Sequence, residues 1–325
     1  GNVNTLVSHT GDGVTTGNRS SIDPVISSDG SRIAFETFAT NLVAGQVDSN
    51  NTIDVFLFDR NTGITSLVSH TGDGVTTGNN ASINPVISSD GSRIAFETLA
   101  TNLVSGVTDS NGTITDLYLY TLSGNVNTLV SHTGDGVTTG NSSSFGPVIS
   151  SDGSRIAFQT SATNLVSGVT DGDGTGSDIY LADAVTGTLE VVAPPATPSA
   201  TAIGAINRGS IAGDGRYVVF VSNAPNLVAG QVDSNNTNDV FLFDRNTGIT
   251  SLVSHTGDGV TTGNSLSFEP VISSDGSRIA FETRATNLVS SVTDSNGTND
   301  VYLHTLSGNV NTLVSHTGDG VTTGN

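Results

Sequence analysis

One phrase recurs five times along this chain at an almost constant interval. It reads PVISSDGSRIAFET, whole or nearly whole, in four copies and GSIAGDGRYVVFVS in a divergent one, and the copies start at Pro24, Pro85, Pro147, Gly209 and Pro270. The Asp-Gly pair inside each copy lies 61 or 62 residues from the next. A fixed period of this length is typical of repeat architectures, so the 325 residues are expected to form five copies of one module.

The second module illustrates how one unit is expected to fold. Apolar runs at 83–88 and 93–98 flank Asp90-Gly91, a pair that favours a tight hairpin with positive φ at both central residues. After a polar loop, residues 116–120 alternate aromatic and aliphatic side chains, and a Ser-Gly-Asn turn leads to a fourth run at 126–132. Each module therefore predicts four short antiparallel strands.

The strand pattern predicts the fold class. Four strands in each unit, with no helical periodicity, indicate an all-β fold: a five-bladed β-propeller of four-stranded antiparallel blades, with residues 1–325 as one domain. A β-helical solenoid is the structural alternative. Its strands are parallel, whereas Asp-Gly and Asn-Thr-Gly turns require antiparallel hairpins, so the propeller is preferred.

The fourth-strand segment occurs once more often than the other three. GNVNTLVSHTGDGVTTGN stands at both 1–18 and 308–325, so one copy is surplus for ring closure. If 3–8 pairs with 301–305, the chain ends are joined and an exposed sheet edge is removed. If 310–316 instead completes its own blade, the first eighteen residues are free or pair with another molecule, which would allow self-association. The residues alone leave both outcomes open.

Charge composition limits the classes of partner. The chain carries 30 acidic and 10 basic residues, for a net charge of −20, so it lacks the basic face that nucleic acid or an anionic membrane requires. Cations are better candidates as partners of this acidic chain.

No apolar stretch approaches the length of a membrane span, and the absence of Cys excludes disulfides and thiolate chemistry. Because Met is also absent, we expect a processed piece of a longer protein.

An acid-rich loop lies between the second and third strands of every module. Three loops read DSNxTxD, with oxygen-bearing side chains at positions 1, 3, 5 and 7, as in the first half of an EF-hand loop. Two are one residue longer, which places the last carboxylate at position 8. Asp, Asn and Gly also make good turns, but a turn needs no carboxylate at both ends, so the loops predict a calcium cofactor. The expected ligands are Asp48, Asn50, Thr52, Asp54, Asp109, Asn111, Thr113, Asp116, Asp171, Asp173, Thr175, Asp178, Asp233, Asn235, Thr237, Asp239, Asp294, Asn296, Thr298 and Asp300.

Other chemistry-bearing residues are assigned structural roles. One His in most modules follows Val-Ser on the outer strand, and these are expected to be exposed strand ends, too far apart to share a metal: His9, His70, His132, His255 and His316. The Asp of each Ser-Asp-Gly turn is interpreted as a turn residue paired with the following Arg, not as part of a catalytic triad. Second strands end in Glu36, Glu97, Gln159 and Glu282. Glycosidases use unlike carboxylates on unlike blades, so no active site and no enzyme activity are expected.

Differences between the modules gather at the start of the first strand and the end of the second. These positions share one end of a four-stranded blade with the acid-rich loops, which predicts a ligand face on loops stiffened by metal. Neutral drift at exposed loops is the alternative. The residues expected on the ligand face are Arg19, Asp23, Phe38, Asn84, Leu99, Glu269 and Arg284.

Two phrases carry a family resemblance over nearly the whole chain. PVISSDGSRIAFET and residues 224–248, APNLVAGQVDSNNTNDVFLFDRNTG, resemble the TolB-like, WD-repeat-like propeller blades of many bacterial surface and secreted proteins. The resemblance implies a propeller fold and a secreted or cell-surface location. It is specific for fold and weak for function, because one fold hosts many activities.

Taken with the loops, these features predict a non-enzymatic, calcium-binding interaction scaffold. It is expected to bind a protein or glycan on the face that carries the acid-rich loops. A lectin-like carbohydrate binder with one shallow site per blade is the second hypothesis, and a glycosidase-like enzyme is the third.

Overall fold

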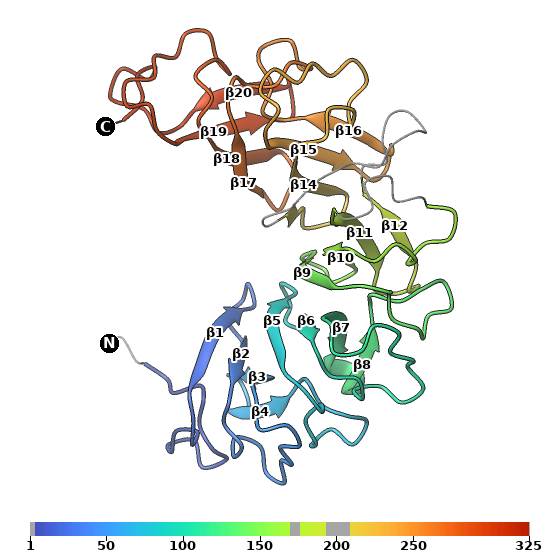
Figure 1. The fold of residues 1–325 in the computed structure, drawn as a ribbon. Coiled ribbons are helices and arrows are strands. Elements are labelled where there is room, and N and C mark those ends of the chain that lie inside the picture. Colours follow the sequence, from blue (N-terminus) through green and yellow to red (C-terminus); the bar gives the residue numbers. More distant parts are fainter. Residues whose placement is uncertain (1–3, 170–175, 193–208, 325) are drawn as a thin grey trace. The chain divides into compact units, whose positions relative to one another are not determined.

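Each of the five repeats forms one four-stranded antiparallel sheet in the computed structural model, which describes residues 4–169, 176–192 and 209–324 (Figure 1). Sequential strands are neighbours in every sheet, which is the order of a propeller blade and confirms the predicted fold class. The strands are β1 (Ser21–Ile26), β2 (Arg32–Thr37), β3 (Asp54–Asp59) and β4 (Ile64–Leu67) in blade 1; β5 (Ser82–Ile87), β6 (Arg93–Thr98), β7 (Asp116–Thr121) and β8 (Val126–Leu129) in blade 2; β9 (Ser144–Ile149), β10 (Arg155–Thr160), β11 (Asp178–Asp183) and β12 (Leu189–Val191) in blade 3; β13 (Ser210–Ile211), β14 (Tyr217–Ser222), β15 (Asp239–Asp244) and β16 (Ile249–Leu252) in blade 4; and β17 (Ser267–Ile272), β18 (Arg278–Thr283), β19 (Asp300–Thr305) and β20 (Val310–Leu313) in blade 5.

The chain forms two compact units. Unit 1 comprises Gly1–Ile156, Ala162–Ser167 and Ala182–Leu189, and unit 2 comprises Ala157–Ser161, Gly168–Leu181 and Glu190–Asn325. The boundary passes through blade 3. Unit 1 therefore contains blades 1 and 2 complete, and unit 2 contains blades 4 and 5 complete.

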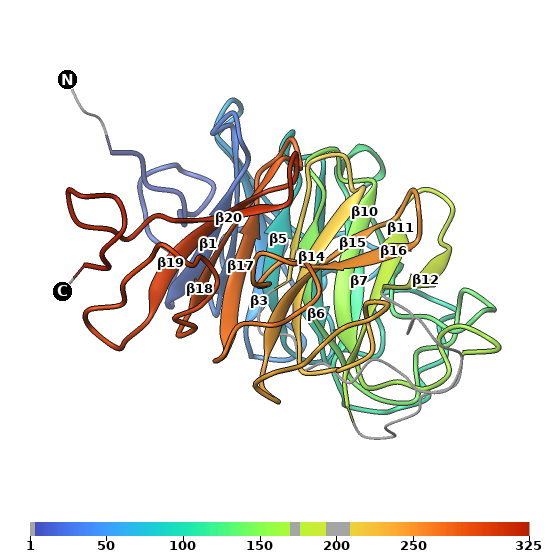
Figure 2. The ribbon, with the colours of Figure 1, turned by 90° about the horizontal axis from the view of Figure 1, so that it is seen from above.

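The second and third strands are the most buried elements of each blade. β2 pairs with β3 along its full length, from Arg32↔Asp59 to Thr37↔Asp54. Within unit 1, β5 packs against β1, β2 and β3 of the preceding blade (Figure 2). A strand covered by sheets on both faces does not need the polar and apolar alternation of a half-exposed strand, which explains why RIAFET is buried at consecutive positions.

The apolar core of unit 1 lies between blades. Val55, Leu57 and Val68 of blade 1 pack against Ile94 and Tyr120 of blade 2 in one cluster of buried side chains. Burial of large side chains at such an interface contributes about 1.5–3 kcal/mol each. The equivalents of Val55, Leu57, Val68 and Ile94 form the core between blades 4 and 5.

The His side chains at the ends of outer strands are mostly buried, so the prediction of exposed strand ends is wrong for three of them. His9, His70 and His255 are at most 6 % exposed, whereas His316 is exposed. In these three cases, the segment that carries the His lies against the following blade, where the His ring meets an aromatic ring of the third strand edge-on. The ring pairs and their centroid distances are His9–Phe58 (5.3 Å), His70–Tyr120 (5.8 Å) and His255–His304 (5.5 Å).

The Ser-Asp-Gly turn is wider than the predicted two-residue hairpin. Only Gly30 has a positive φ, 69°, and Asp29 does not. Asp29 Oδ1 instead accepts the Ser27 hydroxyl at 2.7 Å, so its predicted role as a turn residue is confirmed. Arg32 lies 3.4 Å from the Asp59 carboxylate across the β2–β3 pair, and the predicted pairing of Arg32 with the turn Asp is wrong.

First strands bend at the residue before Pro. Asp23, Asn84, Gly146 and Glu269 have φ between 47° and 63°, and a β-bulge interrupts β1, β5 and β17 at this point. The left-handed region costs an ordinary L-residue about 1–2 kcal/mol, and Gly, Asn and Asp tolerate it best. The bulge turns the residue out of the sheet, where it is exposed.

The C-terminal copy of the duplicated segment completes its own blade. β20 pairs with β19 from Tyr302↔Leu313 to Thr305↔Val310. In the N-terminal copy, Asn18 donates its amide to Thr40 Oγ1 at 2.8 Å, which fastens this segment to blade 1. Among the described residues, no helix has the length and apolar character needed to cross a membrane.

Candidate functional site

In each blade with described loop residues, the acid-rich loop docks onto the connector, the segment that follows the blade's own outer strand. In blade 1, the Ser49 backbone N–H donates to Thr77 Oγ1 at 2.9 Å, and the Asn50 amide donates to Gly78 O at 2.7 Å. The Ser-to-Thr bond recurs in blades 2, 4 and 5. The loop that was predicted to bind metal therefore has a structural role: it fastens its own blade to the connector.

Inside the loop, side-chain oxygens cap backbone groups. Asp48 Oδ1 accepts two backbone N–H groups, that of Asn50 among them, and Asn50 Oδ1 accepts the Thr52 N–H at 2.7 Å. Asp54, which closes the loop, accepts the Ser69 hydroxyl at 3.1 Å. These are the Asx turns that the composition favours without any ion, and the same bonds shape the loops of blades 4 and 5.

The closing carboxylates are buried. Asp54, Asp116 and Asp239 are 2–4 % exposed, and burial raises the pKa of each carboxyl to about 7, even though a Ser hydroxyl and an Asn amide oppose the shift. The carboxylate at position 1 of the same loop raises these pKa values further, because like charges disfavour ionisation. A cation bound beside them would favour the charged form and lower the pKa.

Two loop oxygens are buried without a hydrogen-bond partner: Thr52 Oγ1 and Asn111 Oδ1. The extra residue in the blade 2 loop leaves Asn111 Oδ1 without the N–H that its counterpart Asn50 receives from Thr52. In the other longer loop, Asp171, Asp173 and Thr175 lie outside the described residues, and Asp178 begins β11.

Each described loop thus brings together two carboxylates and one Asn of the predicted ligand set. In the part of the chain that the structure describes, no group of three or more acidic, His or Cys side chains is placed to hold a metal. Calcium takes six to eight oxygens, so backbone carbonyls and water would have to complete any site. Thr113, Thr237 and Thr298 are exposed at the loop surface.

The variable positions do gather at the loop end of the blade. The Phe38 N–H donates to the residue before β1, which joins the end of one strand to the start of the other. In blade 5, Arg284 Nε donates to Asn299 Oδ1 of the acid-rich loop at 2.8 Å. Arg19, Phe38 and Arg284 are exposed, and Leu99 is half-buried. These bonds place the end of the second strand beside the start of the first strand in blade 1 and beside the acid-rich loop in blade 5.

Asp23 and Asn84 line an open cleft of about 490 Å³ between the first strands of unit 1. Glu36 Oε1 accepts the Asn84 N–H at 2.7 Å, and Glu97 Oε1 accepts the Gly146 N–H at 2.9 Å. Both Glu side chains are buried, which raises their pKa, and the Asp23 and Glu97 carboxylates raise that of Glu36 further. The cleft lining contains no basic side chain.

Sequence reasoning missed this cleft because it treated Glu36 and Glu97 as strand ends without a role. The useful signal was the variable residue before Pro, because the backbone N–H groups of Asn84 and Gly146 at this position donate to the two Glu carboxylates. Glu269 holds the equivalent bulge in unit 2, where it is exposed.

Comparison with known proteins identifies the fold. No protein-family model matches the chain, and no curated protein shows significant similarity. Solved structures do match: TolB from Acinetobacter baumannii (18 % identity, 93 % of this chain and 57 % of that chain covered, TM-score 0.44), an oligogalacturonate lyase in complex with manganese (12 %, 93 % and 68 %, TM-score 0.51) and a prolyl endopeptidase (12 %, 89 % and 35 %, TM-score 0.50). The chain thus spans a little over half of the TolB chain.

These likenesses establish a class of protein, the β-propeller. Together with the strand order of the blades, the likenesses at TM-scores of 0.50 and 0.51 confirm the propeller fold that the sequence predicted. At sequence identities of 12–18 %, these likenesses show the fold but not the activity or the ligand.

The prediction that the chain is not an enzyme is contradicted. An oligogalacturonate lyase and a prolyl endopeptidase share this fold at TM-scores of 0.51 and 0.50, so a repeated-blade architecture does not separate binding modules from enzymes. Near-identical blades can still form an asymmetric site. The residue before Pro differs between the first three blades, so the cleft is lined by Asp23, Asn84 and Gly146 at equivalent positions.

Proposed function

We propose that this chain is a calcium-binding interaction module of a secreted or cell-surface bacterial protein. Its ligand, a protein or a glycan, binds at the end of the blades that carries the acid-rich loops. The observation that carries the proposal is the buried Asp that closes each loop, with a pKa of about 7 in blades 1, 2 and 4 and a second carboxylate beside it. Such a pair is stabilised by a divalent cation, and a hard oxygen donor set suits calcium.

The unpartnered oxygens support the same conclusion. Thr52 Oγ1 and Asn111 Oδ1 are buried without a donor, and a buried oxygen in this state costs about 1–3 kcal/mol unless something binds it. Asp48, Thr52 and Asp54 would hold the ion in blade 1, and Asp109, Asn111 and Asp116 would hold it in blade 2. The affinity is expected to be modest, because each loop supplies only two carboxylates.

Thermal unfolding with and without calcium tests the metal proposal. A ligand that binds only the folded chain stabilises it by about 2.7 kcal/mol at one hundred times its Kd. Calcium is therefore expected to raise the melting midpoint relative to a chelated sample, and magnesium at equal concentration serves as the control for ionic strength. A midpoint indifferent to calcium from pH 7 to pH 8.5 would contradict the proposal.

The ligand face is tested separately. Arg19, Phe38 and Arg284 vary between modules and are exposed beside the acid-rich loops, as expected of a recognition surface. The wild-type chain would be applied to a glycan array and to an array of bacterial envelope proteins, alongside Phe38→Ala and Arg284→Ala. Loss of a specific signal in these variants is the expected result. A control variant, Val185→Ala, changes an exposed residue at the opposite, hairpin end of blade 3 and is expected to bind as the wild type does.

A further inference from the structure

A large cavity of about 800 Å³ opens between blades 2 and 3 within unit 1. Its walls are apolar and include Leu119, Val130, Ile156 and Leu165. Small-molecule sites in proteins are clefts of about 300–1,000 Å³ with mainly apolar walls. The lining of the cavity contains none of the predicted metal ligands of the acid-rich loops.

The cavity has a clear origin in the sequence. The fifth residue of the third strand carries a ring in four blades and a methyl group in blade 3: the five residues are Phe58, Tyr120, Ala182, Phe243 and His304. Two positions further along, Leu122 and Leu306 pack against the interblade cores of their blades, and Ala184 stands in blade 3. The interface between blades 2 and 3 is therefore the same core with two large side chains removed.

The partner of the missing ring is still present. In the described interfaces of blades 1, 2 and 5, a His ring meets the third-strand ring edge-on at 5.3–5.8 Å. His132 is the equivalent His for blade 3, and it lines the cavity together with Ala182. On the hairpin, Gly187 replaces the Asn125 whose Oδ1 lies 3.1 Å from His70 Nε2 in blade 2, so this side of the His132 ring also lacks its usual neighbour.

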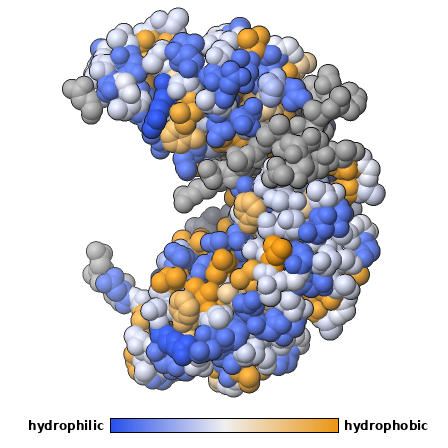
Figure 3. All heavy atoms as spheres, viewed as in Figure 1, coloured by the Kyte–Doolittle hydropathy of each residue, from blue (hydrophilic) through white to orange (hydrophobic). Residues whose placement is uncertain are grey.

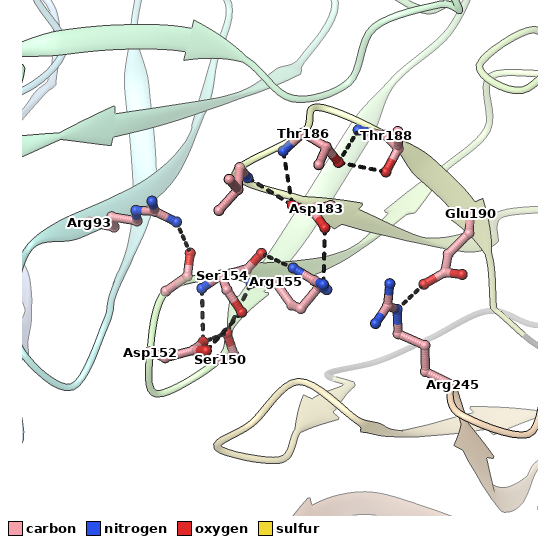
Figure 4. A network of polar contacts seen from close by, with 12 residues as sticks. Arg93, Ser150, Asp152, Ser154, Arg155, Asp183, Thr186, Thr188, Glu190 and Arg245 are labelled. Atoms are coloured by element: carbon pink, nitrogen blue, oxygen red, sulfur yellow. Dashed lines mark hydrogen bonds and ion pairs between the residues drawn. The ribbon is translucent and has the colours of Figure 1, made fainter.

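The charge on the lining is negative. Asp183 lines the cavity but its carboxylate is neutralised by Arg155 Nη2 at 2.9 Å (Figure 4). Asp135 also lines the cavity, and neutral donors hold it, including Thr138 Oγ1 at 2.6 Å and the Val137 N–H at 2.9 Å. No described residue forms an ion pair with Asp135, so it is free to attract a cation.

We propose that this cavity binds a small aromatic amine, whose ring takes the place that Tyr120 fills in blade 2 and whose ammonium group faces Asp135. The ring would pack edge-on to His132 over Ala182. Aromatic pairs of this geometry are favourable, and dry cavities left by a missing side chain accept ligands of matching shape.

Tryptamine is a suitable probe because the chain contains no Trp, so indole fluorescence reports only on the ligand. We expect a saturable blue shift of tryptamine emission with one site per chain. Ala182→Phe fills the cavity and is expected to weaken binding at least tenfold while raising the melting midpoint. Ala44→Phe adds the same ring at an exposed loop position and is the matched control, expected to bind tryptamine as the wild type does.

Two further measurements separate the parts of the proposal. Indole-3-propionate carries the same ring with a negative charge and is expected to bind several-fold more weakly, and equal binding would overturn the role of Asp135. Tyr120→Ala opens the equivalent space in blade 2 and is expected to add a second tryptamine site. The absence of a saturable shift with folded wild-type protein, or unchanged binding in folded Ala182→Phe, would overturn the aromatic site.

Discussion

At the scale of single residues, the chain holds several side chains in states that cost free energy. Buried Asp54, Asp116 and Asp239 are protonated up to about pH 7, and Glu269 adopts the left-handed conformation at φ 50°. Such unfavourable states are found where binding or close packing requires them. A single substitution at each residue measures its free-energy cost.

The buried aspartates predict that the calcium-free chain loses stability as pH rises. Their folded pKa of about 7 lies above the ordinary value of 3.8, so between pH 4 and pH 7 the folded state binds more protons than the unfolded state. A shift of this size corresponds to at most about 4 kcal/mol per group. Urea unfolding in chelator is expected to show a more stable chain at pH 5 than at pH 8, and Asp54→Asn, which removes one of the three groups, should weaken that dependence. Equal stability at both pH values would contradict the raised pKa.

A second prediction concerns the bulge residue Glu269. Gly146 holds the same bulge without strain, because Gly adopts positive φ freely, so Glu269→Gly is expected to stabilise the chain by about 1 kcal/mol. The reverse change, Gly146→Glu, is expected to destabilise it by a similar amount. Chemical denaturation measures both. A destabilised Glu269→Gly would mean that the Glu side chain makes a contact that offsets its backbone strain.

At the scale of elements, neighbouring blades are joined by buried Asn hydrogen bonds as well as by apolar packing. Asn127 on β8 is buried and donates its amide to Val68 O at 2.9 Å and to His70 O at 3.0 Å of the preceding blade. Asn311 on β20 makes the same two bonds to Val253 O and His255 O. These bonds attach the folded-back connector of one blade to the outer strand of the next.

Loss of the Asn127 hydrogen bonds is expected to destabilise the interface between blades 1 and 2. Asn127→Ala leaves two buried carbonyls without their shared donor, which costs about 1–3 kcal/mol. Thr128→Ala, at the exposed neighbouring position, is the matched control and is expected to change the free energy of unfolding by less than about 0.5 kcal/mol. Hydrogen exchange would show the loss at residues 68–70 first. Equal effects of the two substitutions would contradict the stabilising role of the Asn127 hydrogen bonds.

At the scale of the whole molecule, charge is the dominant property. A net charge of −20 on 325 residues makes the folded chain repel itself, and hydrophilic side chains cover much of the surface seen in Figure 3, with apolar groups visible between them. Exposed apolar side chains in unit 1 include Ile22 and Ile26 on β1. A strongly acidic surface attracts cations non-specifically, so calcium effects must be separated from screening.

Added salt is therefore expected to stabilise the chain without any specific site. Raising NaCl from 10 to 300 mM shortens the Debye length from about 30 Å to below 8 Å, which weakens repulsion between exposed carboxylates. The melting midpoint is expected to rise over this range in chelator, and calcium at constant ionic strength should raise it further. If calcium adds nothing beyond its ionic strength, screening alone accounts for its effect.

The amino-acid sequence by itself determined the repeat, the strand order and the end of the blade where variable residues gather. These features are local or periodic: Asp29 and its copies mark hairpins, RIAFET marks the buried strand, and equal spacing makes equal blades. An alignment of the modules also shows that Ala182 stands where the other blades have a ring, but the alignment does not show the cavity that results.

Only the tertiary structure decided what the side chains meet. His70 looked like an exposed strand end, but the connector folds back and buries its ring against Tyr120. Glu36 looked like a strand end, but the bulge of the next blade gives its carboxylate an N–H donor and a shared cleft. Contacts between blades join residues some 50 or 60 positions apart, and no local pattern encodes such a meeting, because its geometry depends on how whole sheets pack.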